Sequence, residues 1–306
     1  MQQDQKYIDF LRWGALAAVL SGVLCLAGLI ALFTKGLNLG LDFTGGVVVE
    51  LRFKEEADTA EVASRLSEAG LEGALVVHFG SERDVLVRLP PTESKSIGED
   101  VLQAVGAAKS GAELKRVDFV SAQIGSELRD EGGMAFLVSL LLVAGYVAAR
   151  FQWKLSVGAI VAVFHDVLVT VGLFAIFEWE FDLPALAAVL SLVGYSINDT
   201  IVIYDRIREN FRAMRRVDRY AICNISLTQT LGRTLTTSAL TQLVVVAMLL
   251  VGGQQLHSFS LALFIGIIVG SYSTVYIASA ISLWLGLDRA DLMLPVKDER
   301  TAQEAP

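Results

Sequence analysis

Charged residues are scarce in this sequence, and the residues that build metal or disulfide sites are scarcer still. Only 19% of the 306 residues are Asp, Glu, Lys or Arg, and there are two cysteines and three histidines. Cys25 falls in an apolar segment and Cys223 in a polar stretch between two others, so they predict neither a disulfide nor a metal site. No basic patch with interleaved aromatic residues stands out, which excludes a typical nucleic-acid partner.

Hydrophobic residues, in contrast, make up 54% of the chain and gather into six long runs. A helix needs about 20 apolar residues to cross the ~30 Å hydrocarbon core, and it satisfies its own backbone hydrogen bonds there. The first run is too long for a signal-peptide core, and no small-residue cleavage site follows it. We therefore predict an α-helical polytopic protein that crosses the lipid bilayer six times, at residues 13–33, 132–150, 154–177, 183–204, 231–252 and 258–287.

Basic residues divide the loops between these spans into two groups. The loops 178–182 and 252–258 contain no Lys or Arg. The other two loops and their flanks contain nine, namely Arg150, Lys154, Arg206, Arg208, Arg212, Arg215, Arg216, Arg219 and Arg233. Because Lys and Arg are enriched in cytoplasmic loops, we predict that both termini and the basic loop are cytoplasmic, at residues 1–12, 288–306 and 205–230.

The segment 34–131, which this orientation places outside the membrane, is predicted to be a small soluble domain. Runs rich in β-branched residues alternate with amphipathic stretches. Strands are expected at 45–53, 74–79, 84–89 and 113–122, and helices at 59–70 and 96–109. The order βαββαβ is typical of an α+β ferredoxin-like domain. The segment has no His/Cys cluster, phosphate loop or nucleophile with a partner base, so we expect it to hold or move something.

The fourth span carries a carboxylate, Asp199, where hydrocarbon is expected. Pro184 suits the first turn of this helix, and the helical rise places Asp199 about 22 Å from that outer end. Low dielectric disfavours an ionised carboxylate, and a nearby guanidinium stabilises it. If Arg233 of the fifth span approaches and leaves Asp199, the acid can release and take up a proton. The two residues are therefore a predicted proton relay, with a static salt bridge as the alternative.

Small and polar residues form stripes around both members of this pair, and the two stripes could face each other across the bundle interior. Serine and threonine also serve simple helix packing, which explains the hydroxyls but not the charges. The stripes consist of Ser191, Tyr195, Asp199 and the adjacent Asn198 on the fourth span, and of Arg233, Thr237 and Thr241 on the fifth.

Two further features lie in the third and sixth spans. Asp166, next to His165, is about 18 Å from Lys154 along the third span. The two residues could belong to the same proton pathway or only satisfy neighbouring groups.

The sixth span carries a ridge of small residues four apart, which predicts close helix contact within the chain or with a partner. The ridge consists of Gly266, Gly270, Thr274, Ala278 and Ser282.

Several motifs resemble the SecD/SecF family, which is related to the RND transporters. The stretch "LGLDFTGGVVVELRF" (39–53) is similar to the family's "DFTGG" signature, here Asp42, Phe43, Thr44, Gly45 and Gly46. The segments "YIDFLRW" (7–13), "HDV" (165–167), "VGYSINDTIVIYDRIREN" (193–210) and "SLTQTLGRTLTTS" (226–238) resemble further family motifs in the expected order. SecD proteins carry a much larger outer domain, so the chain resembles the SecF branch.

The resemblance implies a subunit of the bacterial Sec machinery in the inner membrane. It implies a six-span SecD-like partner, since an RND-type function needs two halves, and also the Sec translocon channel and an unfolded secretory polypeptide as partners. The pair would use proton flow to help pull the polypeptide across the membrane. Asp199 would conduct protons, with Arg233 as its cationic partner and Thr237 beside it. We expect no cofactor other than the coupling ion, a proton, with sodium as the alternative.

Two other functions are weighed against this one. An intramembrane serine hydrolase would use Ser196 in "GYSI" with His257 as base, but those residues are expected near opposite membrane surfaces, too far apart for a hydrogen bond. Half of an RND-type small-molecule exporter would share the membrane features, yet an outer domain of about 90 residues is small for capturing drugs. We therefore expect a transport protein and not an enzyme.

Overall fold

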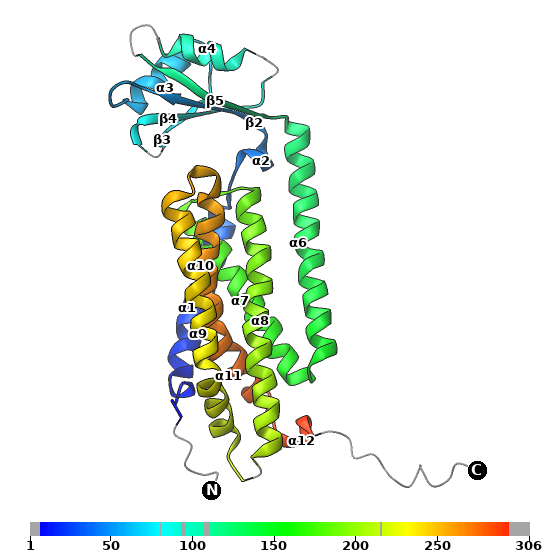
Figure 1. The fold of residues 1–306 in the computed structure, drawn as a ribbon. Coiled ribbons are helices and arrows are strands. Elements are labelled where there is room, and N and C mark those ends of the chain that lie inside the picture. Colours follow the sequence, from blue (N-terminus) through cyan, green and yellow to red (C-terminus); the bar gives the residue numbers. More distant parts are fainter. Residues whose placement is uncertain (1–6, 80, 93–95, 107–110, 215, 294–306) are drawn as a thin grey trace, which may run out of the picture.

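The computed structural model describes residues 7–79, 81–92, 96–106, 111–214 and 216–293. It shows a bundle of long apolar helices with a small sheet domain at one end (Figure 1). We call this the sheet end of the bundle and the opposite one the far end. The beginning of the first long helix and the short helix α12 (Arg289–Leu292) both lie at the far end.

Six helices of the described chain are long and apolar enough to cross a membrane, which confirms the predicted fold class. A short 3₁₀ turn, Leu11–Trp13, precedes the first of them. The sixth is α10, which continues through a π-helical turn, Thr274–Ala278, into α11 (Ser279–Trp284) after a 3₁₀ turn at Gln254–Leu256. The long helices are α1 (Gly14–Thr34), α6 (Ala122–Arg150), α7 (Trp153–Phe177), α8 (Leu183–Ala213), α9 (Arg219–Val251) and α10 (His257–Ser273).

Three of these helices extend well beyond the apolar runs. Helix α6 begins at Ala122 and not at residue 132, and the Ser121 side chain caps its first turn. The prediction of a basic loop at 205–230 is wrong, because α8 continues to Ala213 and α9 already begins at Arg219. The last turns of α8 stay helical because Ile207 and Phe211 are buried one turn apart while Arg212 is exposed, so the helix is amphipathic there.

The sheet domain has the predicted βαββαβ order. Its four strands form an antiparallel sheet in the order β3–β4–β2–β5. Alternate residues of β2, Val47, Val49 and Leu51, are fully buried on the side covered by helices α3 and α4. The other side of the sheet faces the bundle (Figure 1). The elements are β2 (Gly46–Arg52), α3 (Thr59–Glu68), β3 (Leu75–Phe79), β4 (Ser81–Leu89), α4 (Ile97–Ala104) and β5 (Glu113–Val120). The predicted helix 96–109 ends earlier, and its residues 107–109 lie outside the described residues.

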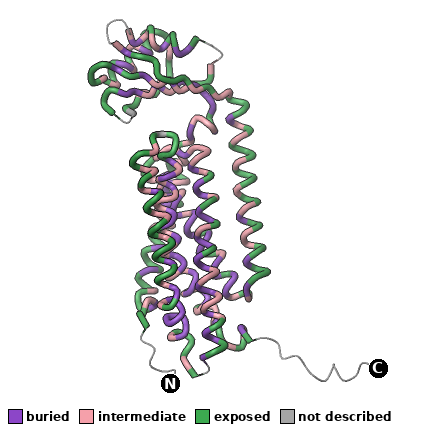
Figure 2. Tube along the Cα trace, viewed as in Figure 1, coloured by how far each residue is buried: buried purple, intermediate pink, exposed green. Residues whose placement is uncertain are grey.

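Helices α7, α8 and α10 form the centre of the bundle. More than half of the apolar part of α7 is buried (56%), against only 11% for α6 and for α9 (Figure 2). The small-residue ridge of the sixth span lies inside this core: Gly266 faces Leu192 and Gly270 faces Ser196 on α8, so the ridge makes its close contacts within the chain. The π-helical turn was not predicted; its first residue, Thr274, bonds Thr200 of α8 through its hydroxyl at 3.2 Å.

Helix α1 is fixed to the core by a close crossing of two glycines. A Cβ built on Gly172 of α7 would lie 2.7 Å from the Gly28 Cα of α1, which is closer than real Cβ atoms approach. The two backbones can therefore touch only while both residues lack a side chain.

We expect Gly172→Val to separate α1 from α7 and to lower the thermal unfolding midpoint of the detergent-purified protein. Overpacking of this kind costs about 1–3 kcal/mol. Gly22→Val is the matched control, because a Cβ on that α1 glycine meets nothing within 4 Å. Equal midpoints for the two variants would contradict the crossing.

Candidate functional site

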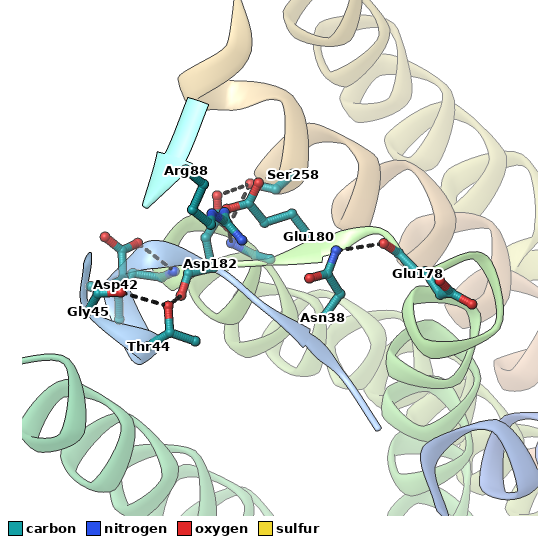
Figure 3. Close-up of polar contacts among 12 residues, drawn as sticks. Asn38, Asp42, Thr44, Gly45, Arg88, Glu178, Glu180, Asp182 and Ser258 are labelled. Atoms are coloured by element: carbon teal, nitrogen blue, oxygen red, sulfur yellow. Dashed lines mark hydrogen bonds and ion pairs between the residues drawn. The ribbon is translucent and has the colours of Figure 1, made fainter. Parts of the chain in front are cut away.

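The DFTGG motif forms a joint between the sheet domain and the bundle. Asp42 lies in the one-turn helix α2 (Leu41–Thr44), and its Oδ2 accepts a hydrogen bond from the Leu183 N–H at 3.1 Å (Figure 3). Leu183 is the first residue of α8, whose first amides have no partner within the helix. The Thr44 hydroxyl closes α2 by donating to the Gly40 carbonyl at 3.1 Å. The motif thus caps the membrane helix that carries Asp199.

A second carboxylate, Asp182, completes the cap. Its Oδ1 accepts from the Ala185 N–H at 2.8 Å, and the Ser258 hydroxyl of α10 donates to both of its oxygens at 2.6 and 2.7 Å. Burial raises the pKa of the Asp182 carboxyl, the negative charge of Asp42 acts in the same direction, and the bonds from Ser258 and Ala185 oppose them. The sheet ends of α8 and α10 are therefore held together through one acid.

Backbone pairing and ion pairs extend the joint on either side. Strand β1 (Asn38–Leu39) pairs in parallel with β6 (Glu180–Phe181), directly before α8. Arg88 of the sheet domain forms an ion pair with Glu180 (Figure 3). Lys35, at the end of α1, bonds Glu178 at 2.6 Å, which holds the pKa of that carboxyl below its usual value.

The two glycines of the motif are required by their backbone and by close neighbours. Gly45 has a φ of 67°, and a Cβ there would lie 2.8 Å from the Cα of Ala122, the first residue of α6. Gly46 has a φ of 128°, and its Cβ would lie 2.5 Å from the Leu89 carbonyl oxygen. The joint therefore contacts the start of α6 as well as the start of α8.

Sequence reasoning singled out the motif but not its partners. Arg88, Glu180, Asp182 and Ser258 were absent from the predicted site residues. The one available signal was Asp182, two residues before Pro184, because an acid followed by proline is a common helix start. A cleft of about 800 Å³ lies between the sheet and the bundle beside these residues.

Asp199 lies in the bundle core, as its sequence position predicts. The residue is only 5% exposed, and its Oδ2 has no hydrogen-bond partner within the described part of the chain. Arg233 is exposed on α9, and no ion pair joins it to Asp199 among the described residues. The static salt bridge considered above is thus not formed in this arrangement.

The α8 stripe contacts α9 through a residue beside the predicted α9 stripe, Ser238. The Tyr195 hydroxyl of α8 donates to Ser238 Oγ of α9 at 3.1 Å, and Ser238 bonds Ser271 of α10 at 3.0 Å. Asn198 on α8 and Thr237 on α9 are exposed. Much of each polar stripe therefore lies on the surface of this chain and not between its own helices.

Asp166 and His165 form a separate buried cluster. The Ser196 hydroxyl donates to Asp166 Oδ2 at 2.5 Å, and His165 Nδ1 lies 3.0 Å from Asp166 Oδ1. Both Asp166 oxygens are thus satisfied by neighbours, whereas His165 Nε2 has no partner among the described residues. Ser196 packs against Gly270 of α10, and Gly270 lies about 20 Å along that helix from His257. Ser196 and His257 therefore form no nucleophile–base pair.

The chain is similar to known proteins along its whole length. Residues 100–288 match the family described as protein export membrane protein SecD/SecF, C-terminal, and residues 30–57 match the SecD/SecF GG motif. The protein translocase subunit SecF of Vibrio alginolyticus is 45% identical over 304 residues, covering 98% of this chain and 96% of that protein. The SecF subunit of Pseudomonas aeruginosa is 46% identical over 301 residues and 98% of both chains.

Solved structures agree with this similarity. The crystal structure of SecDF from Thermus thermophilus, a translocon-associated membrane protein, has a TM-score of 0.84 at 36% identity and covers 93% of this chain. SecDF in a super-membrane-facing form has a TM-score of 0.69, also at 36% identity, and covers 99% of this chain. This chain spans only 39% and 40% of those SecDF chains.

We expect Gly45→Ala to loosen the joint more than Gly70→Ala does. Both residues have positive φ, so neither site suits Ala, and Gly45, with a ψ of 173°, lies in a backbone region that is essentially restricted to Gly. Only Gly45 has a backbone atom in the way, since a Cβ on Gly70 meets nothing within 4 Å. The measurement is thermal unfolding of the purified protein together with protease cleavage at the joint. The joint assignment is wrong if Gly70→Ala is cleaved as readily as Gly45→Ala.

Proposed function

This chain belongs to the SecD/SecF family of protein export membrane proteins, and on that premise we propose that it couples ion flow across the bacterial inner membrane to polypeptide export. In this proposal it is the SecF subunit of a Sec translocase. It acts beside a SecD-like partner and the translocon channel on an unfolded secretory polypeptide. The relatives are named translocase subunits, so a small-molecule exporter is not favoured.

The observation that carries the proposal is the buried carboxylate of Asp199 with one oxygen unpaired. An unpaired buried charge is costly, and protonation removes that cost. One charge that crosses a potential of 100 mV yields about 2.3 kcal/mol. A close Arg233 would favour proton release from Asp199, and a distant Arg233 would favour proton uptake. This cycle of uptake and release would convert the energy into helix movement. A proton is the proposed ion, and sodium would need more oxygen ligands around the same carboxylate.

Helix α8 connects this acid to the joint. Asp199 lies about 24 Å along the helix from Leu183, whose amide is capped by Asp42. A shift or tilt of α8 would therefore act directly on the motif that holds the sheet domain.

The exposed polar stripes support a partner with its own six spans. Gly194 and Asn198 of α8 and Gly232, Arg233 and Thr237 of α9 are exposed in this chain. Intramembrane charges almost always face a bundle interior or a water-filled cavity. We propose that these stripes face the SecD-like half, with both termini in the cytoplasm and the sheet domain on the outer side, as the loop charges predict.

We expect Asp199→Asn to abolish the ion-gradient-dependent part of export in reconstituted vesicles while the protein still folds and binds its partner. The amide keeps the size of the side chain but cannot exchange a proton. Asp130→Asn, at an exposed acid of α6, is the control and should export at the wild-type rate. Full gradient-driven export by Asp199→Asn would refute the relay. If sodium but not proton gradients drive wild-type export, the site is a sodium site.

We expect Gly194→Trp and Gly232→Trp to prevent copurification with the SecD-like partner. A Cβ at either position meets nothing within 4 Å, so the chain alone should fold normally. Gly133→Trp, on α6 with equally open space, should retain the partner. Loss of copurification only in the α6 variant would place the partner on the other side of the bundle.

A further inference from the structure

A groove of about 580 Å³ opens at the far end of the bundle, between the end of α6 and the last turns of α8. Three arginines line it, Arg150 from α6 and Arg208 and Arg212 from α8, together with the carboxylates of Asp205 and Glu209. Glu209 is held by a fourth arginine outside the groove, Arg206, at 2.6 Å. Positive charge is therefore in excess at this surface, and the proposed proton pathway uses none of it.

One acid and one aromatic ring hold two of these arginines in place. Arg150 Nη2 donates to both oxygens of Asp205, at 3.1 and 2.9 Å, and Arg208 Nη1 donates to Oδ1 at 3.2 Å. The guanidinium carbons lie 5.1 and 5.6 Å from the ring centroid of Phe151. Asp205 thus engages one terminal nitrogen of each guanidinium, and a guanidinium has five N–H donors. The two groups are preorganised to bind a second anion.

Aromatic residues place the groove at the level of the lipid headgroups. Tyr146 and Trp153, on either side of Arg150 in sequence, are 55% and 57% exposed. Such exposed Tyr and Trp side chains are typical of the membrane–water interface. Asp205 lies about 33 Å along α8 from Leu183, slightly more than the hydrocarbon thickness. Beyond the groove, α6 presents Leu141 and Leu142, which are 72% and 69% exposed.

We propose that this groove binds the phosphate of an anionic phospholipid, whose acyl chains lie along the exposed apolar face of α6. Guanidinium groups pair with phosphate through two parallel hydrogen bonds. Basic pockets between membrane helices are suited to anionic headgroups. The bound lipid bridges α6 and α8 at the far end, beside the ion pair of Arg150 with Asp205, and so restricts their separation during movement of α8.

The test uses the full chain purified in a neutral detergent. Phosphatidylglycerol should raise the thermal unfolding midpoint by several degrees, and phosphatidylcholine with the same acyl chains should not. The Arg150→Gln/Arg208→Gln variant should lose this shift and bind phosphatidylglycerol about tenfold more weakly in native mass spectrometry, as expected for the loss of a charge-assisted bond. Arg219→Gln, at an arginine of the same end that does not line the groove, should behave as the wild type.

Three results would overturn the proposal. Equal shifts with both lipids would show that headgroup charge is not recognised. The same shift with inorganic phosphate alone would make the groove a site for free anions. Retention of the shift in the double variant would place the lipid elsewhere. If the double variant does not fold, Arg212→Gln replaces it, because Arg212 takes no part in the ion pairs of Asp205.

Discussion

The hydrogen bond from the Leu183 amide to Asp42 is the contact on which the arrangement of this protein depends. It joins a motif between the first span and the sheet domain to the first residue of the helix that buries Asp199. Asp182 and Ser258 extend the same joint to α10, and Gly45 extends it to α6. A displacement of any one of these helices must therefore be transmitted to the others or break the cap.

The bundle core contains two buried acids in different environments. Asp166 has both oxygens satisfied, by His165 and Ser196, and behaves as part of a fixed polar cluster. Asp199 is buried with one oxygen unpaired among the described residues. Because a satisfied polar group stabilises one arrangement and an unsatisfied one favours change, the first acid suits a structural role and the second suits a switch.

The sequence predicted what is set by local periodicity and missed what is set by contacts between distant residues. Six apolar runs and alternating β-branched residues were sufficient for the six helices and the βαββαβ domain. Hydropathy could not locate the ends of α8 and α9, because Ile207 and Phe211 keep a polar stretch amphipathic and helical. The bond between Asp42 and Leu183 joins residues 141 positions apart. The exposure of Arg233 depends on the rotation of α9 in the bundle, which a stripe of residues does not fix.

The surfaces that this chain leaves open are chemically distinct. The faces of α8 and α9 carry glycines, hydroxyls and Arg233 at membrane depth, where lipid tails offer no hydrogen bonds, so another protein suits them better than lipid does. Helix α6 is apolar from Met134 to Ala149 and ends at Arg150, beside Arg208 of α8, which matches a phospholipid from tail to headgroup. In the proposed arrangement, lipid would anchor α6 and the partner would hold the outer faces of α8 and α9. Movement started at Asp199 would then be directed along α8 toward the joint with the sheet domain.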